Sequence, residues 1–347
     1  MGRYDLSRAD VADLLPGEPR YRVDQLWTGL YQRGAEPGSL ATLPRALRAR
    51  LAVEPALAPS LSPDVEVATP DGSTRKWRFA LAGGYRIETV LMEYPDRATV
   101  CVSTQAGCAM ACGFCATGQA GFDRNLSVGE IVEQAVRGAA TARARGRRLS
   151  NVVFMGMGEP LANYDRVWPA VERLHAELGL SARHLTVSTV GVVPGIRRLA
   201  AETLPVNLAV SLHAADDELR DRLVPLNHRY PLAALLDACA TWRAARNRRL
   251  SFEWALIDGV NDRPDDARRL AALARPLRAH VNLIPLNPTP GWPTRGTPPA
   301  GVGAFRDRLV AAGVNATVRR NRGVGIDAAC GQLAGRAIAP AAPAGPD

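Results

Sequence analysis

The sequence predicts an α/β fold: a partial (β/α)6 barrel preceded by a small helical N-terminal domain and a short antiparallel β extension. Two observations point to the barrel. Apolar runs of strand length recur from about residue 97 onward, and a stretch of helix length follows each run. A third observation, the different rhythm of the first 96 residues, predicts the two smaller parts. A chain of 347 residues can hold one large domain with such an appendage.

Residues 1–60 are expected to form short helices, because leucines and valines recur there at helical spacing between prolines. Residues 61–96 contain the alternating runs DVEVAT, RKWRFAL and YRIETVLMEY. Turn-forming pairs, Asp71-Gly72 and Gly83-Gly84, separate these runs. This second segment is therefore expected to be a small antiparallel sheet.

The barrel is assigned to residues 97–336. Continuous apolar strands that alternate with helices predict a parallel sheet covered on both faces, with the active site at the carboxyl ends of the strands. Residues 337–347, which are rich in alanine and proline, are expected to be disordered. The six strand-like runs lie at 98–103, 151–157, 184–190, 206–212, 251–257 and 280–286, and a seventh follows at 314–320.

Composition indicates a basic protein that does not span a membrane. The net charge of +9 favours a polyanionic partner such as RNA. The alternative is a GC-rich genome, in which arginine is abundant, since every positive residue except Lys76 is arginine. No run of 18 apolar residues and no signal-peptide core is present, so we expect a cytoplasmic protein.

Three cysteines stand close together after the first barrel strand, in the pattern C-x3-C-x2-C: Cys108, Cys112 and Cys115. Thiolates are soft ligands suited to iron-sulfur clusters. A 4Fe-4S cluster held by three of them keeps one iron open for chemistry. The alternatives are a zinc site with a distant fourth ligand, or buried thiols without a metal.

This cysteine pattern, followed by GMGEP (156–160) after the next strand, resembles the radical SAM superfamily. The resemblance implies that the open iron binds S-adenosylmethionine (SAM) and that reductive cleavage of SAM yields a 5′-deoxyadenosyl radical. It also implies that Gly158 and Glu159 meet the amino group of SAM.

Four segments narrow the resemblance: CVSTQAGCAMACGFCATG, MGMGEPL, SLHA and IDAACGQLAG, in this order. Together they resemble the RlmN/Cfr family of radical SAM ribosomal RNA adenine methyltransferases, over essentially the whole chain. The resemblance implies that one SAM methylates Cys330 and that a second supplies the radical. Cys101 would then release the product by forming a disulfide with Cys330, and Glu88 would accept the proton from the substituted carbon.

The same resemblance assigns a SAM pocket at strand ends. Taken alone, His213 would more often be a structural histidine, Asn287 a turn residue and Glu88 a solvated glutamate. The pocket residues implied are Ser188, Ser211, Leu212, His213 and Asn287.

The family acts on an adenosine of 23S rRNA and, in some members, on the tRNA adenosine beside the anticodon. Carbon 2 of adenine is electron-poor, which favours radical attack over ordinary SAM methyl transfer. Pro160 and the insertion after Asn287 favour carbon 2 over the carbon 8 of Cfr-type enzymes. Three alternatives stay open: carbon 8, a non-catalytic iron-sulfur or zinc RNA-binding protein, and a radical SAM enzyme acting on a protein or small molecule.

The expected partners are RNA and an external electron donor such as flavodoxin, and we expect a monomer. Three arginine groups could contact phosphate. They are Arg143, Arg145, Arg147 and Arg148; Arg246, Arg248 and Arg249; and Arg319, Arg320 and Arg322.

Overall fold

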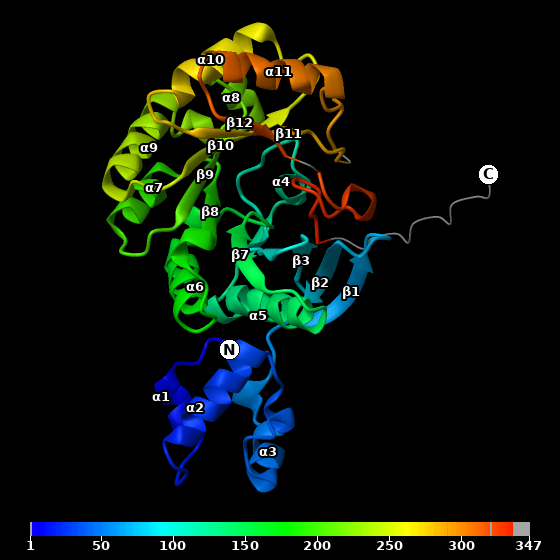
Figure 1. Ribbon diagram of the computed structural model, residues 1–347, viewed down its shortest axis with the longest axis vertical. Coiled ribbons are helices and arrows are strands. Elements are labelled where there is room, and N and C mark those ends of the chain that lie inside the picture. The colour runs from blue at the N-terminus through cyan, green and yellow to red at the C-terminus, as the bar shows by residue number, and fades with distance from the viewer. Residues whose placement is uncertain (1, 290, 320, 336–347) are drawn as a thin grey trace, which may run out of the picture.

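The computed structural model describes residues 2–289, 291–319 and 321–335, and its centre is one curved ten-stranded sheet (Figure 1). The strand order is β1-β2-β3-β4-β7-β8-β9-β10-β11-β12. All neighbours from β4 to β12 pair in parallel, whereas β1 to β4 pair antiparallel. The predicted α/β class is confirmed. The expected tail at 337–347 and Arg320 lie outside the described residues.

The parallel strands coincide with the apolar runs of the sequence. Strand β10 shows why, since all seven of its residues are buried between helices and the barrel interior. The strands are β4 (Ala98–Cys101), β7 (Leu149–Phe154), β8 (Leu185–Thr189), β9 (Asn207–Ser211), β10 (Leu250–Leu256), β11 (His280–Pro285) and β12 (Ala316–Val318).

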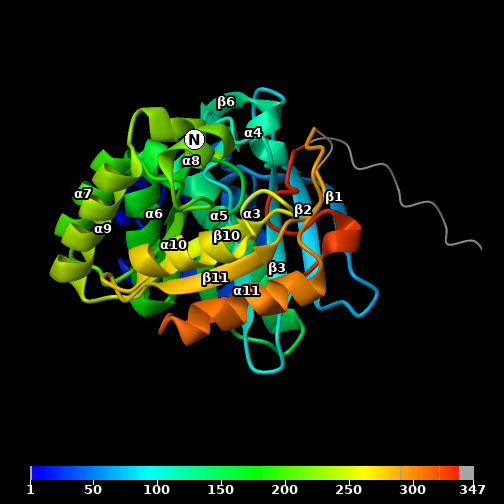
Figure 2. The same cartoon turned by 90° about the horizontal axis from the view of Figure 1, so that it is seen from above.

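The crossover helices lie on the convex side of the sheet, as the view from above shows (Figure 2). Their start signals are local: Ser127 and Glu130 form a capping box at the start of α5, and Pro264 opens α10. The helices are α5 (Val128–Ala144), α6 (Tyr164–Ala176), α7 (Val193–Ala201), α8 (Asp217–Leu223), α9 (Leu232–Arg246), α10 (Pro264–Ala274) and α11 (Pro299–Ala311).

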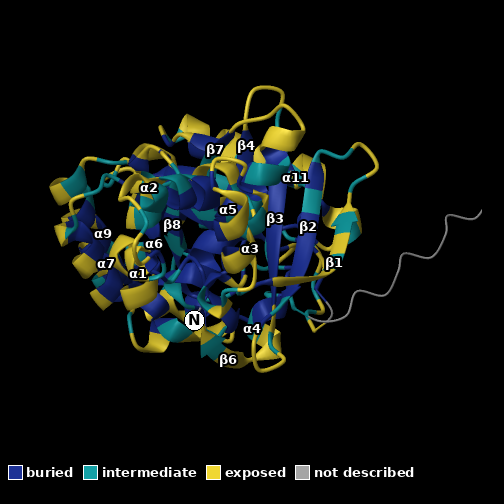
Figure 3. Ribbon diagram, turned by 90° about the horizontal axis from the view of Figure 1, so that it is seen from below, coloured by how far each residue is buried: buried dark blue, intermediate teal, exposed yellow. Residues whose placement is uncertain are grey.

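The antiparallel part continues the barrel sheet without a break. Strands β1 (Ser62–Ala68), β2 (Thr74–Ala80) and β3 (Arg86–Glu93) extend it from β4. Strand β1 is an exposed edge, whereas β2 and β3 are largely buried (Figure 3). The inner strands are therefore covered by other parts of the chain, and that cover includes the C-terminal segment described below.

The N-terminal helices α1 (Arg8–Asp13), α2 (Tyr21–Thr28) and α3 (Arg45–Ala52) pack below α5 and α6 in Figure 1. Polar contacts fix this position. Asp5 accepts a hydrogen bond from the Gly129 backbone at the start of α5, at 2.7 Å. Trp27 donates to Glu177 at 2.5 Å. In the part of the chain that is described, no helix is both long and apolar enough to span a membrane.

Candidate active site

The cysteine loop is held in a compact fold at the carboxyl end of β4. A small hairpin of β5 (Gln105–Gly107) and β6 (Phe122–Asn125) brackets the loop, and α4 (Ala116–Ala120) closes it. Gly118 is essential to this fold, because a Cβ there would lie 2.8 Å from the carbonyl oxygen of Cys112. The loop therefore wraps directly over the first turn of α4.

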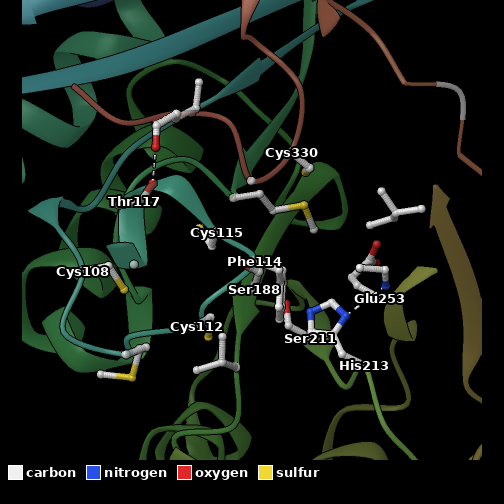
Figure 4. Close-up of a pocket in the computed structure, with 18 of the residues that line it drawn as sticks. Cys108, Cys112, Phe114, Cys115, Thr117, Ser188, Ser211, His213, Glu253 and Cys330 are labelled. Carbon is white, nitrogen blue, oxygen red and sulfur yellow. Dashed lines mark hydrogen bonds between the residues drawn. The ribbon is translucent and has the colours of Figure 1, made fainter. Parts of the chain in front are cut away.

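The three cysteines line a cavity inside the barrel, which we call the inner cavity (Figure 4). Residues from six further parallel strands, β7 to β12, complete its wall, as expected for a site at the carboxyl edge of a barrel. Of the residues predicted from sequence, the wall includes Cys108, Cys112, Cys115, Gly158, Glu159, Ser188, Ser211, His213, Asn287 and Cys330. In Figure 4 the three cysteines lie on one side, opposite Ser211 and His213.

The GMGEP turn after β7 presents its backbone to this cavity. Gly158 has φ +96°, and a Cβ there would lie 2.5 Å from the Cβ of Gln105 and 2.8 Å from its backbone nitrogen. Only glycine combines this backbone conformation with so close an approach.

Gly158→Ala is expected to weaken SAM binding at least about tenfold, because positive φ costs about 1–3 kcal/mol and the turn must also move away from Gln105. Isothermal titration with SAM measures the effect. Gly179→Ala is the matched control, since Gly179 also has positive φ (+69°) but has open space around it. Equal, small effects in the two variants would contradict the tight fit of the turn.

Glu159 braces the same turn. Its carboxylate accepts hydrogen bonds from the backbone nitrogens of Leu161 at 2.9 Å and Val190 at 2.8 Å, which ties the turn to the end of β8. The Glu159 backbone in turn donates to Gln105 at 2.8 Å. Burial raises the pKa of the Glu159 carboxyl to about 7 despite these hydrogen bonds.

This pKa shift predicts a pH effect on stability. The folded pKa of about 7 exceeds the ordinary value of 4.5, so between these values the folded state retains a proton that the unfolded state has released. The contribution of Glu159 to stability is therefore full below pH 4.5 and is lost as pH rises through about 7. The free energy of unfolding in urea should decrease between pH 5 and pH 7.5, and the decrease should be larger in wild type than in Glu159→Gln. An identical decrease in the two proteins would contradict the raised pKa of Glu159.

The SLHA segment after β9 places two of its three predicted residues in the wall. His213 has φ +61°, and its Nδ1 accepts a hydrogen bond from the Ala255 backbone at 3.0 Å. Burial lowers the pKa of His213 to about 3, so the imidazole is neutral at pH 7. Leu212 departs from the expectation: it is fully buried in the core and is not part of the cavity wall.

The loop that contains Cys330 is attached by hydrogen bonds to α4, the helix that directly follows Cys115. The Ala116 backbone donates to Gly331 O at 2.8 Å, and the Thr117 hydroxyl donates to Leu333 O at 2.5 Å. Asn287 donates to Cys330 O at 3.0 Å. Residues 215 positions apart in the chain, Cys115 and Cys330, thus line one cavity.

A second cavity adjoins the inner one and contains Cys101 (Figure 4 shows the Cys330 side). Cys330 belongs to the walls of both cavities, together with Met155, Arg319 and Leu333. Cys101 lies at the end of β4 and is buried, which raises its thiol pKa to about 12. The structure therefore brings the two predicted catalytic cysteines to one space, with all six cysteines as free thiols.

Glu88 lies outside both cavities, on the inner side of β3. It is 2% exposed, forms an ion pair with Lys76 at 3.5 Å, and accepts a hydrogen bond from the Ala334 backbone at 3.2 Å. Burial raises the pKa of its carboxyl. The Cys330 loop covers Glu88, so the side chain is not the solvated surface glutamate that the alternating strand alone would suggest.

Two residues of the cavity wall, Glu253 and Arg319, were not predicted as part of the SAM pocket. Glu253 on β10 uses one oxygen to accept from Asn282 at 2.8 Å, while its Oε2 is buried and has no partner among the described residues. That oxygen can accept a hydrogen bond from a ligand in the inner cavity. Arg319 stands in the wall of both cavities, and the neighbouring Cys330 thiol raises its pKa. Both positions lie within strand-like runs, at 251–257 and 314–320, and this is the one signal that could have revealed them.

The buried Arg220 was also missed, and it supports the site from behind. Its guanidinium donates to Val190 O at 2.6 Å and Leu212 O at 3.1 Å, and so joins the ends of β8 and β9. Asn227 accepts from it at 2.7 Å. A charged side chain 1% exposed is retained only with such partners, and here they are strand-end carbonyls.

The donor set fits an iron-sulfur cluster. Three thiols line one cavity beside a strand-end turn, and burial raises the pKa of Cys108 to about 12, so metal binding would have to displace protons. Among the described residues, no group of three or more His, Cys, Asp or Glu has the geometry of a single-ion site. Ligands of a cluster stand further apart than ligands of one ion, because each binds a different iron.

Comparison with known proteins agrees with this geometry. Residues 102–271 match the radical SAM superfamily. A crystal structure of a radical SAM methyltransferase from Sphaerobacter thermophilus is 50% identical and superposes with a TM-score of 0.92, covering 97% of this chain and 100% of that one.

Relatives of similar length carry a more specific name. A Roseiflexus protein is 50% identical over 96% of both chains, and one from Salinispora tropica is 54% identical over 95% of this chain and 91% of its own length. Each is named "Probable dual-specificity RNA methyltransferase RlmN". Identity at this level over nearly the whole length shows the family: the chain belongs to the RlmN family of radical SAM RNA methyltransferases.

Proposed function

We propose that this RNA methyltransferase methylates carbon 2 of an adenosine in 23S rRNA, and of the tRNA adenosine beside the anticodon, through an S-methylcysteine on Cys330. One observation carries the proposal. Cys330 stands where the inner cavity, with the three clustered cysteines, meets the second cavity, with Cys101. The "dual-specificity" in the relatives' name supports two kinds of RNA.

Cys108, Cys112 and Cys115 would hold the 4Fe-4S cluster, and the strand-end residues of the inner cavity would hold SAM. When bound, this pair supplies a 5′-deoxyadenosyl radical by one-electron reductive cleavage of SAM. Gly158 presents backbone toward the amino end of SAM, and the neutral His213 adds an uncharged surface beside it. Asn287 and Ser188 line the same wall. The Asn287 side chain also donates a hydrogen bond to Cys330 O, and the Ser188 hydroxyl donates one to Phe154 O.

Cys330 is the carrier in this proposal. Its thiolate attacks the methyl group of a first SAM, which leaves as S-adenosylhomocysteine. With a second SAM bound, the S-methyl group would lose one hydrogen atom to the 5′-deoxyadenosyl radical, and its carbon would bond to carbon 2 of the adenine. The adduct would then return one electron to the cluster, which replaces the electron used to cleave SAM. The product is then attached covalently to the enzyme. Two SAM molecules are consumed per turnover.

Cys101 releases the RNA. Its thiolate attacks the sulfur of Cys330, the S–S bond forms, and the bond between that sulfur and the adenine-linked carbon breaks. That carbon keeps the electron pair of the broken bond and takes up a proton, so it becomes the methyl group. Glu88 would take the proton from carbon 2, and its raised pKa suits a group that must hold that proton. Because Glu88 lies outside both cavities, its hydrogen bond to the Ala334 backbone must open for this transfer. An external reductant such as flavodoxin then returns both cysteines to thiols. A transient disulfide of this kind suits the reducing cytoplasm.

Nucleoside analysis of RNA treated with the reconstituted enzyme tests the position of methylation. The expected product is 2-methyladenosine in 23S rRNA and in tRNA. The same RNA incubated without reductant is the control and should stay unmodified. Formation of 8-methyladenosine alone would overturn the proposal in favour of Cfr-type chemistry.

A further inference from the structure

A surface groove adjoins the second cavity. The groove is lined by the loop between β1 and β2, the turn between β3 and β4, the loop before β7 and residues 321–323. It shares Tyr94, Pro95, Asn321 and Arg322 with the second cavity. The second cavity in turn shares Cys330 with the inner one. Shared wall residues thus place the three spaces next to one another, from the surface groove to the reactive cysteine.

Arginines from two distant sequence groups meet in this groove. Arg145 forms an ion pair with Glu93 at 2.7 Å. Arg147 donates to Pro95 O at 2.5 Å and Arg322 to Glu93 O at 2.9 Å, so both bind backbone carbonyls. Within the described residues neither has a carboxylate within ion-pair distance.

The acidic groups of the groove are already engaged. Glu93 is held by Arg145, and Asp71 accepts hydrogen bonds from the Thr69 hydroxyl at 2.5 Å and the Ser73 backbone at 3.0 Å. Two guanidinium groups with unused N–H donors therefore remain, and they match the charge and geometry of phosphate oxygens.

Tyr94 stands at the boundary between the groove and the second cavity. The Arg322 guanidinium carbon lies 4.2 Å from the centroid of its ring, and that of Arg97 lies 4.4 Å from it. Aromatic rings and guanidinium planes are the surfaces on which proteins stack unpaired bases. The second cavity beyond Tyr94 continues with apolar walls, Val90, Met92 and Ala329 among them.

We propose that the groove of Arg145, Arg147, Arg322 and Tyr94 binds the RNA backbone beside the target adenosine, and that the flipped base reaches Cys330 through the second cavity. The proposal rests on the proposed function, since it takes Cys330 as the reacting group. A base must leave its stack to reach a buried centre, and the flanking phosphates then need a fixed position at the mouth of the path.

RNA binding by the full-length, cluster-loaded protein tests this groove. The probe is a labelled stem-loop of 23S rRNA containing the adenosine, measured by fluorescence anisotropy at several salt concentrations. For Arg147→Ala and Arg322→Ala we expect weaker binding and a salt slope smaller by about 0.7–0.9 per lost phosphate contact. Arg249→Ala is the matched control, because Arg249 is exposed just before β10 and lines neither the groove nor the second cavity.

Variants of Tyr94 distinguish the contribution of base stacking from that of charge. Tyr94→Ala is expected to reduce RNA methylation about tenfold at limiting RNA, whereas Tyr94→Phe, which keeps the ring, should stay near wild type. In every variant, mass spectrometry of the Cys330 peptide after incubation with SAM should still show the S-methyl group.

That second readout keeps the two proposals apart. An unmethylated Cys330 in wild type would overturn the proposed function. If Cys330 is methylated but Arg147→Ala and Arg322→Ala have the same RNA affinity and salt slope as Arg249→Ala, only the proposed role of the groove is overturned. Arg322→Lys retains the charge and should recover part of the RNA binding that Arg322→Ala loses. Loss of binding in Arg322→Lys together with a lower melting temperature would identify a folding defect, and it would overturn the role of Arg322.

Discussion

Replacing Cys330 by alanine is expected to abolish RNA methylation while the iron-sulfur cluster still assembles. Cys330 lines the inner cavity but is not one of the three clustered thiols, so its loss removes the methyl carrier and leaves the ligands in place. Activity should decrease by a factor of at least about 10³, since Cys101, the other thiol of the second cavity, does not line the inner cavity where SAM would bind. Methylated nucleosides are measured by mass spectrometry and the cluster by its iron content and absorbance.

The matched control is Cys239→Ala, which removes a buried thiol on α9 that lines neither cavity. This variant should keep methylation activity. Loss of the cluster in Cys330→Ala would show that Cys330 is a ligand, and retained methylation would show that it is no carrier.

Replacing Cys101 by alanine is expected to trap the enzyme on its RNA. The carrier Cys330 stays intact, so the carbon–carbon bond to adenine still forms, but no thiol in the second cavity can attack the Cys330 sulfur. Turnover should stop after one event. On a denaturing gel with thiol reductant, we expect a band of the covalent protein–RNA complex. Treatment with ribonuclease should reduce the size of this complex.

The double variant Cys101→Ala/Cys330→Ala supplies the control, since it has no carrier and should form no complex. Multiple turnovers by Cys101→Ala would contradict the releasing role and would direct attention to another nucleophile in the second cavity.

The cysteine loop and the strand-end motifs could be predicted from sequence because their information is local. A run of apolar residues followed by GMGEP specifies a strand and the turn that ends it, and parallel strands place their ends together. This is why Gly158, Ser188 and His213 line one cavity with Cys108. The steric need for Gly158 is not visible in that local pattern, since it comes from Gln105 at the start of β5, 53 positions earlier in the chain.

Other features depend on contacts that no sequence interval displays. Glu88 reads as a surface residue until the Cys330 loop, almost 250 positions later, is placed over β3. Leu212 sits within a motif yet points into the core, because β9 alternates its side chains between core and cavity. The arginines that the sequence groups together also lie in different places. Arg319 lines the cavities, whereas Arg145, Arg147 and Arg322 line the groove.

The most direct test of the S-methylcysteine account is the fate of hydrogen from the SAM methyl group. With SAM carrying a trideuterated methyl group, passage through Cys330 requires one deuterium to leave as the S-methyl group forms its carbon radical. The account predicts that 5′-deoxyadenosine gains one deuterium and that the methyl group on adenine retains two. A product methyl group that keeps all three deuterium atoms, with unlabelled 5′-deoxyadenosine, would show direct transfer from SAM and would contradict the role of Cys330.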